Sequence, residues 1–421
     1  MPLALPLSLA TSVAPARNVD SAVALRRMTD RYDLIYLPLG AAAFGGAERS
    51  LLDLAGGAVA RGKRVLTLAE PALKDTLFPA LAAERGVDLA WVDWAPERSL
   101  LHVVRSAIAT FRRYRAPVIH FNISWRPGMW SVPVVARLLT SARLIGSMRA
   151  MPDPHGLIPA KRHFGFVPGM RLWHVPEVIV GHVWARALHS TVSINRDDFP
   201  ARLIRHYGYR RDRLRVIYNG VHIPAALPSP DERAESRRRF GFSDRDFLLC
   251  CAGRVSTEKG IAHLVRAMEG TPPECCLAIV GDGPARAELE VEVKARGLAD
   301  RVRFLGFQAD PYGIIGASDV VVVPSTWYEA FGRTVVEAMA YGVPVVASRI
   351  GGMGELFDSG VEGLLVPAGD PDALRDALTA LARDRNATSE MGRRARALAR
   401  ERYSFDRVLE QYLTAYDELS K

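Results

Sequence analysis

Short runs of apolar residues alternate with helical patterns along most of this chain, and this alternation constrains the fold more than any other feature. In the second half the runs are continuously rich in Val, Ile and Leu, as expected for strands that helices cover on both faces. A regular succession of strand and helix is typical of parallel α/β architecture. We therefore predict an α/β fold built on parallel sheets.

The apolar runs fall into two series separated by a proline-rich segment. The first series predicts strands at residues 34–39, 64–68, 89–92, 118–121, 144–147, 178–181, 190–193 and 215–218. The second predicts strands at residues 247–253, 276–281, 302–304, 320–324, 343–348 and 363–367. Between them, residues 223–229 have the proline content of a linker. We predict two domains, at residues 28–222 and 223–402, with a ligand cleft between them.

Both ends of the chain lie outside the two strand series. Residues 1–16 are apolar and uncharged, and the first basic residue is Arg17. Because a secretory signal carries its positive charge before the apolar run, we interpret residues 1–27 as a loose N-terminal extension. At the other end we predict a polar helix over about residues 370–402 and a final helix that begins at Phe405.

The composition excludes several classes of protein. Lys and Arg outnumber Asp and Glu by 55 to 46, but 49 of the 55 are Arg, and an Arg excess with abundant Ala is typical of a GC-rich genome. No basic tail or aromatic–basic pattern is present, so we expect no nucleic-acid partner. No stretch of about 20 apolar residues is free of charge, which excludes a membrane span. The cysteines form two adjacent pairs without metal or redox spacing, which favours buried strand cysteines in a reducing cytoplasm.

The segment 324–344 carries the strongest functional signal. A buried strand is predicted to end near its start, and a helix is predicted to follow the loop. A helix N-terminus binds phosphate well through its free backbone N–H groups, which here are those of Phe331, Gly332, Arg333 and Thr334. Glu329 in the loop and Glu337 on the helix bracket this position. Carboxylates beside a phosphate site suit sugar hydroxyls, although two solvated acids at a helix start would have the same spacing.

In this order the motifs resemble the paired-glutamate signature of retaining glycosyltransferase family 4, which has the GT-B fold. Residues 253–260 and 280–284 resemble the family's phosphate-binding stretch and its next strand end. Residues 218–221 and 351–355 resemble the linker entry and the following donor-side loop. The resemblance covers about residues 33–415. It implies two Rossmann-like parallel-sheet domains facing a cleft, with a C-terminal helix at 403–421 that crosses back onto the N-terminal domain.

The resemblance also implies roles for the charged residues that match. Arg254 and Lys259 would hold the donor pyrophosphate and neutralise charge as the nucleoside diphosphate leaves. Glu329 would bind hydroxyls of the donor sugar, and Glu337 would bind those of the ribose. These four residues, with the amide groups of 331–334, form the predicted donor site.

The N-terminal domain supplies further candidates. Gly45 and Gly46 would let the backbone approach the pyrophosphate from the opposite side of the cleft, and Gly46 stands where a P-loop would need Lys, which excludes an ATP site. His120 is predicted to end its strand facing the cleft as a catalytic residue, or else to be a core histidine. Family members often have His-x-His here, whereas this chain has Asn122 at the second position. Asn122 and Arg149 are therefore assigned to the acceptor side, with a structural role as the alternative for Arg149.

Two patterns that suggest a metal are discounted. Asp244 and Asp246 form a DxD pattern, but they lie in a loop before a strand, away from the donor motifs, and GT-B enzymes generally need no such metal. The histidines at 155, 174 and 182 do not have the spacing of a metal-ligand cluster. We expect no metal and no cofactor beyond a nucleotide-sugar co-substrate.

These features predict a retaining, nucleotide-sugar-dependent hexosyltransferase. Residues 34–50 look similar to the start of actinobacterial aminoglycoside-biosynthesis members, which implies transfer of N-acetylglucosamine from UDP-GlcNAc to 2-deoxystreptamine. The alternatives are a mannosyl- or glucosyltransferase of exopolysaccharide or glycolipid assembly, a nucleotide-sugar epimerase, and a catalytically idle sugar-binding protein. The Arg-rich stretch 103–115 could contact a membrane surface, but a solvated helix face is favoured.

Overall fold

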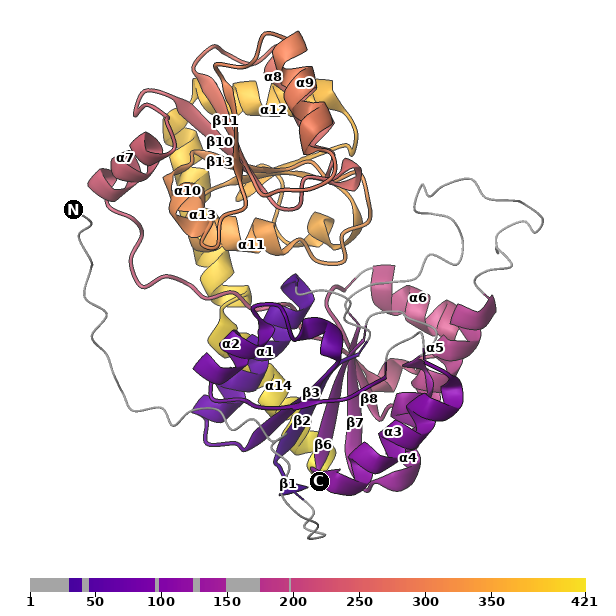
Figure 1. Ribbon diagram of the computed structural model, residues 1–421. Coiled ribbons are helices and arrows are strands. Elements are labelled where there is room, and N and C mark those ends of the chain that lie inside the picture. Colours follow the sequence, from indigo (N-terminus) through magenta and orange to yellow (C-terminus); the bar gives the residue numbers. More distant parts are fainter. Residues whose placement is uncertain (1–29, 40–44, 95–97, 124–128, 149–174, 197) are drawn as a thin grey trace.

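The computed structural model describes residues 30–421 except 40–44, 95–97, 124–128, 149–174 and 197, and it contains two α/β domains (Figure 1). The N-terminal sheet has seven parallel strands. Their order is β4 (Asp88–Trp91), β3 (Val65–Ala69), β2 (Leu34–Leu39), β6 (Val118–Ile123), β7 (Arg143–Met148), β8 (Ser190–Ser193) and β9 (Leu214–Val216). A small separate pair joins β1 (Asp30–Arg31) to β5 (Tyr114–Arg115).

Helices cover both faces of this sheet. One face packs against α3 (Leu100–Arg113), α4 (Ser131–Leu139), α5 (Val175–Ala187) and α6 (Asp198–Tyr207). The other face packs against α1 (Gly46–Ala60), α2 (Phe78–Glu84) and the C-terminal helix α14 (Phe405–Ser420). Burial on both faces explains why β2 and β3 are mostly apolar, although β6 and β8 also carry buried polar residues.

The C-terminal sheet has six parallel strands. Their order is β12 (Val302–Gly306), β11 (Cys275–Val280), β10 (Phe247–Ala252), β13 (Val320–Val323), β14 (Val345–Ser348) and β15 (Gly363–Val366). One face packs against α8 (Ile261–Met268), α9 (Arg286–Ala295) and α12 (Pro371–Arg383). The other packs against α10 (Tyr312–Ala317), α11 (Arg333–Ala340) and α13 (Arg385–Arg402), and α7 (Pro230–Arg239) lies beside α10. This architecture confirms the predicted α/β fold with two parallel sheets.

Two local predictions were wrong. The apolar run 178–181 is not a strand but part of α5, where Val180 and Trp184 are buried one helical turn apart. A short apolar run alone cannot separate a strand from a buried helix segment. The helix predicted over 370–402 is divided at Asp384, whose side chain accepts a hydrogen bond from the Ala387 N–H and caps α13.

The chain crosses between the domains twice, and the two crossings touch. The Val221 N–H donates to the Tyr403 carbonyl (2.8 Å), and the Phe405 N–H donates to the Val221 carbonyl (2.9 Å). Beyond this point α14 packs on the N-terminal sheet, and Figure 1 shows this yellow helix beside the indigo strands of that domain. Among the described residues, no helix has the length and apolar character needed to cross a bilayer.

Candidate active site

A cavity of about 420 Å³ lies at the carboxyl ends of β10 and β13, beside the start of α11. Ligands of open parallel sheets bind at such strand ends. Nearly all of its lining comes from the C-terminal domain, and Gly46 contributes from the other side. The residues of the lining that carry polar chemistry are Arg254, Lys259, Ser325, Glu329, Arg333, Thr334 and Glu337.

The N-terminus of α11 faces this cavity because the chain turns sharply before it. Gly332 precedes the helix with φ = 87°, a left-handed conformation that favours glycine. A Cβ at this position would also lie 2.7 Å from Cγ of Met353. The backbone N–H groups at the start of a helix have no partner within the helix, so those of Arg333 and Thr334 are available to an anion.

Lys259 and Glu329 meet in the cavity although they lie 70 residues apart in sequence. The Lys259 ammonium donates a hydrogen bond to Oε1 of Glu329, and the hydroxyl of Ser325 donates to the same oxygen (3.0 Å). Gly260, with φ = 67°, permits this approach, since a Cβ there would lie 2.0 Å from the carbonyl oxygen of Pro324. The glycine therefore holds the lysine loop against the end of β13.

Arg254 extends from the end of β10 into the same region. It lines the cavity, is exposed, and makes no hydrogen bond or ion pair with the described residues. A guanidinium in this state can grip a phosphate oxygen pair without first losing a protein partner. With Lys259 and the start of α11, it gives the cavity three features that favour an anion.

Glu337 is held by two donors on its Oε1 atom. Nε of Arg333 donates to it at 2.7 Å, and the hydroxyl of Tyr312 donates at 3.0 Å. Burial, together with the negative charge of Glu337, raises the pKa of Tyr312 to about 12, so the phenol stays protonated near neutral pH. The glutamate is therefore oriented by its surroundings.

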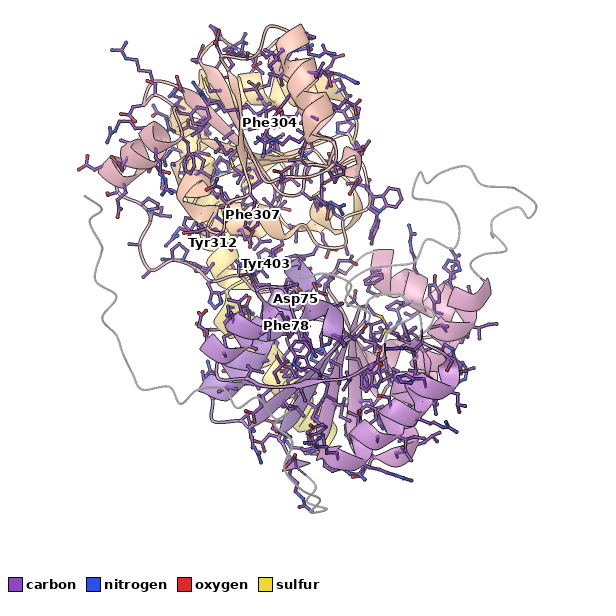
Figure 2. The ribbon with its side chains drawn as sticks, viewed as in Figure 1. Asp75, Phe78, Phe304, Phe307, Tyr312 and Tyr403 are labelled. Carbon is purple, nitrogen blue, oxygen red and sulfur yellow. The ribbon has the colours of Figure 1, made fainter. Side chains whose placement is uncertain are left out.

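A second cavity of about 370 Å³ continues from the first. The two share Ala252, Gly253, Arg254, Thr334 and Glu337. The second extends past the ends of β11 and β12 to Asp282, Phe307, Gln308, Pro311 and Ile315. No motif predicted this wall as part of the site, although residues 280–284 resemble a strand end of the family. Phe307 is 72% exposed, and Figure 2 shows it with Tyr312 on the side of the C-terminal domain that faces the other domain.

The N-terminal domain brings the start of α1 to the cavity. Gly46 lies against the Arg333 side chain, because a Cβ on Gly46 would be 3.8 Å from Cδ of Arg333. The N–H of Gly45 is satisfied by Oε2 of Glu48 at 3.0 Å. Asn122 is buried and donates a hydrogen bond to the carbonyl of Ala47 (3.3 Å), so it supports this helix start. Arg149 lies outside the described residues.

Of the two predictions for His120, the cleft-facing catalytic residue was wrong and the core histidine agrees with the structure. Its strand continues to Ile123, and its ring is completely buried under α14. Nδ1 lies 2.7 Å from the hydroxyl of Tyr416, Nε2 lies 2.7 Å from the hydroxyl of Ser147, and the ring stacks on Tyr412. Both nitrogens are used inside the core, so the ring cannot reach a sugar in the cavity.

The discounted DxD pattern lies away from the cavity, whereas His155 and His174 lie outside the described residues. Asp246 accepts a hydrogen bond from the Ser243 N–H (2.7 Å) in the loop before β10, and neither it nor Asp244 lines either cavity. Within the part of the chain that the structure describes, no group of three His, Cys, Asp or Glu side chains could hold a metal ion.

Known proteins share this architecture and this sequence pattern. Two Rossmann-like parallel-sheet domains with a strand-end cavity define the GT-B class of glycosyltransferase folds, to which the structural neighbours belong. Residues 232–398 match the family described as Glycosyl transferases group 1. The chain is 32% identical over 326 residues to a D-inositol 3-phosphate glycosyltransferase of Xylanimonas cellulosilytica, covering 72% of this chain and 71% of that protein. The chain therefore belongs to the group 1 glycosyltransferase family.

Other similarities are shorter or concern structure. An alpha-D-kanosaminyltransferase of Streptomyces kanamyceticus is 34% identical over 192 residues, which cover 44% of this chain and about half (49%) of that relative. The crystal structure of HepE from Anabaena in complex with UDP and glucose is 26% identical, with a TM-score of 0.76, and covers 92% of this chain and 100% of that one. Sucrose-phosphate synthase from Thermosynechococcus elongatus, at 22% identity and a TM-score of 0.73, shares the fold over 92% of this chain and 99% of its own.

Proposed function

We propose that this glycosyltransferase is a retaining enzyme that uses a UDP-linked sugar and glycosylates a hydroxyl of a small polar acceptor. One observation carries the proposal: Arg254, Lys259 and the start of α11 meet two carboxylates in one continuous cavity. Cationic groups and helix amides suit a pyrophosphate, and the carboxylates suit sugar and ribose hydroxyls. The similarity to a structure that holds UDP supports the choice of nucleotide.

In the proposed reaction the acceptor hydroxyl attacks the anomeric carbon from the face that the leaving diphosphate vacates. The bond from that carbon to the phosphate oxygen breaks, the new glycosidic bond forms, and the hydroxyl proton passes to the departing phosphate. Arg254 and Lys259 neutralise the charge that develops on the nucleoside diphosphate. Glu329, oriented by Lys259 and Ser325, binds the donor sugar and fixes its position for attack.

For donor and acceptor we propose N-acetylglucosamine from UDP-GlcNAc and 2-deoxystreptamine. The relative named as a kanosaminyltransferase, which by its name transfers an amino sugar, supports this choice over part of the chain. A glucosyl- or mannosyltransferase is the second candidate, and the similarity to a structure determined with UDP-glucose favours its glucosyl form. An epimerase would convert the donor in the absence of any acceptor.

The test is a panel of UDP-GlcNAc, UDP-glucose and GDP-mannose, each with and without 2-deoxystreptamine. With UDP-GlcNAc we expect nucleotide release and a pseudodisaccharide product only when the acceptor is present, and an α-linkage by NMR. A matched reaction with Lys259→Met should release no UDP above background. Epimerisation of the donor without acceptor, or a product with an inverted anomeric centre, would contradict the proposal. Turnover of UDP-glucose or GDP-mannose in place of UDP-GlcNAc would favour the second candidate, a glucosyl- or mannosyltransferase.

A further inference from the structure

The side chain of Arg333 connects the two domains. Its Nε donates to Glu337, its Nη1 donates to the Ser50 hydroxyl on α1 (2.8 Å), and its Nη2 lies 3.7 Å from Oδ2 of Asp53, also on α1. The side chain is only 18% exposed. One guanidinium therefore joins a carboxylate of the predicted nucleotide site to a helix of the opposite domain.

Asp53 is buried but does not belong to the proposed donor site. Its side chain is 5% exposed, and its Oδ1 accepts a hydrogen bond from Nη2 of Arg85 (3.0 Å). It lines neither of the two cavities described above, but it lines a neighbouring space of about 230 Å³ that shares Arg333 and Glu337 with the first cavity. Asp53 has no hydrogen bond or ion pair with Glu337 among the described residues, so we expect it to act on a bound nucleotide through Arg333 or through the placement of α1.

The bonding of Glu337 shows what Arg333 controls. Both donors, Arg333 and Tyr312, use Oε1, and no described residue donates a hydrogen bond to Oε2. A free guanidinium tends to grip both oxygens of a carboxylate at once. Here Nη1 donates to Ser50 and Nη2 faces Asp53 at 3.7 Å, and among the described hydrogen bonds of Arg333 only the one from Nε reaches Glu337. The contacts with α1 thus leave one carboxylate oxygen open.

On the basis of the proposed function, we propose that Arg333 is a positioning residue. It couples the binding of the nucleotide at Glu337 to the position of α1 against the C-terminal domain. While the Nη groups of Arg333 remain in contact with Ser50 and Asp53 of α1, Oε2 of Glu337 can accept a hydrogen bond from a hydroxyl of the nucleotide. By reciprocity, a nucleotide bound at Oε2 stabilises the contact between Arg333 and α1. Because Gly46 lies beside the same side chain, this contact also holds Gly45 and Gly46 next to the cavity.

The test is a double-mutant cycle on UDP affinity, measured by isothermal titration calorimetry with wild type, Asp53→Asn, Arg333→Gln and the double variant. We expect Asp53→Asn to weaken UDP binding about fivefold, because the released guanidinium closes over Glu337. In the Arg333→Gln background the same substitution should change the affinity less than about twofold. Ser50→Ala, which keeps the charge pair, supplies a second cycle if Asp53→Asn does not fold.

Arg394→Gln is the matched control. This substitution removes the ion pair between Arg394 and Glu390, which lie four residues apart on α13 and do not contact the N-terminal domain. It should leave the affinity for UDP unchanged. If wild type binds UDP but Asp53→Asn has no effect, or weakens binding equally in both backgrounds, the coupling is overturned and the proposed function stands. If wild type does not bind UDP, both are overturned.

Discussion

Polar residues on the two sheets meet different surroundings. In the C-terminal domain, polar groups follow the ends of β10 and β13 and meet in an open cavity. In the N-terminal domain, His120 and Ser147 lie within β6 and β7, where Tyr412 and Tyr416 of α14 cover them. The position along a strand, and the helix that covers it, therefore decide whether a polar side chain serves a ligand or the core.

The largest effect expected from this comparison is at Lys259. Its replacement by Ala removes the cation paired with Glu329 in the cavity, so kcat/KM should fall about a thousandfold in the proposed transfer reaction. The melting temperature should stay within a few degrees of wild type, because the Lys259 side chain is 36% exposed. Initial rates and calorimetry check both statements. Activity within tenfold of wild type would exclude this pair from catalysis.

The opposite result is expected at His120. His120→Phe removes two buried hydrogen bonds and should lower the free energy of unfolding by about 2 kcal/mol. The rate constant per folded molecule should remain within about twofold of wild type, since the ring does not reach the cavity. Urea unfolding and active-site titration separate the two effects. A hundredfold loss of kcat in folded protein would show that His120 takes part in catalysis. It would contradict the contrast drawn here between the buried polar residues of the N-terminal sheet and those of the cavity.

A smaller effect is expected at Tyr312, where the phenol donates to Glu337. Tyr312→Phe should weaken UDP binding about threefold by releasing one oriented bond to the carboxylate. Because the pKa of Tyr312 is raised to about 12, the phenol keeps its proton from pH 6 to pH 9 and the factor should be constant over that range. Isothermal titration calorimetry at three pH values measures the ratio of UDP affinities between wild type and Tyr312→Phe. A factor that disappears above pH 8 would show that the phenol ionises there.

The smallest effect concerns Cys251, which lines the cavity at the end of β10. Burial raises its pKa to about 12, so almost no thiolate exists at pH 7.5. Iodoacetamide should leave this residue unmodified over an hour in native protein and alkylate it after unfolding in urea. Peptide mass spectrometry reads both states. Rapid alkylation of the native protein would show that this part of the sheet is open to reagents.

Local patterns predicted much of the fold and most of the polar residues that line the first cavity. Continuous apolar runs located the strands, because strands buried on both faces must be apolar. Glu329 and Glu337 were recognisable because the loop and helix that carry them are contiguous. The contact between Arg333 and Ser50 joins residues 283 apart, and His120 is covered by a helix nearly 300 residues later. No local pattern contains such contacts, so they became visible only in the folded chain.

The position of α14 also has a consequence for biosynthesis. The strands of the N-terminal sheet leave the ribosome before the helix that packs on Leu34, Tyr36 and Ile145, because α14 follows all of them in the chain. At about 5–20 residues per second, the delay between β2 and α14 is roughly 20 to 70 seconds. During that interval α1 and α2 can pack on this face, but the apolar residues that α14 contacts stay uncovered, and exposed apolar surface of this kind promotes aggregation. A truncated message that ends before Phe405 would leave the part of that face under α14 exposed permanently.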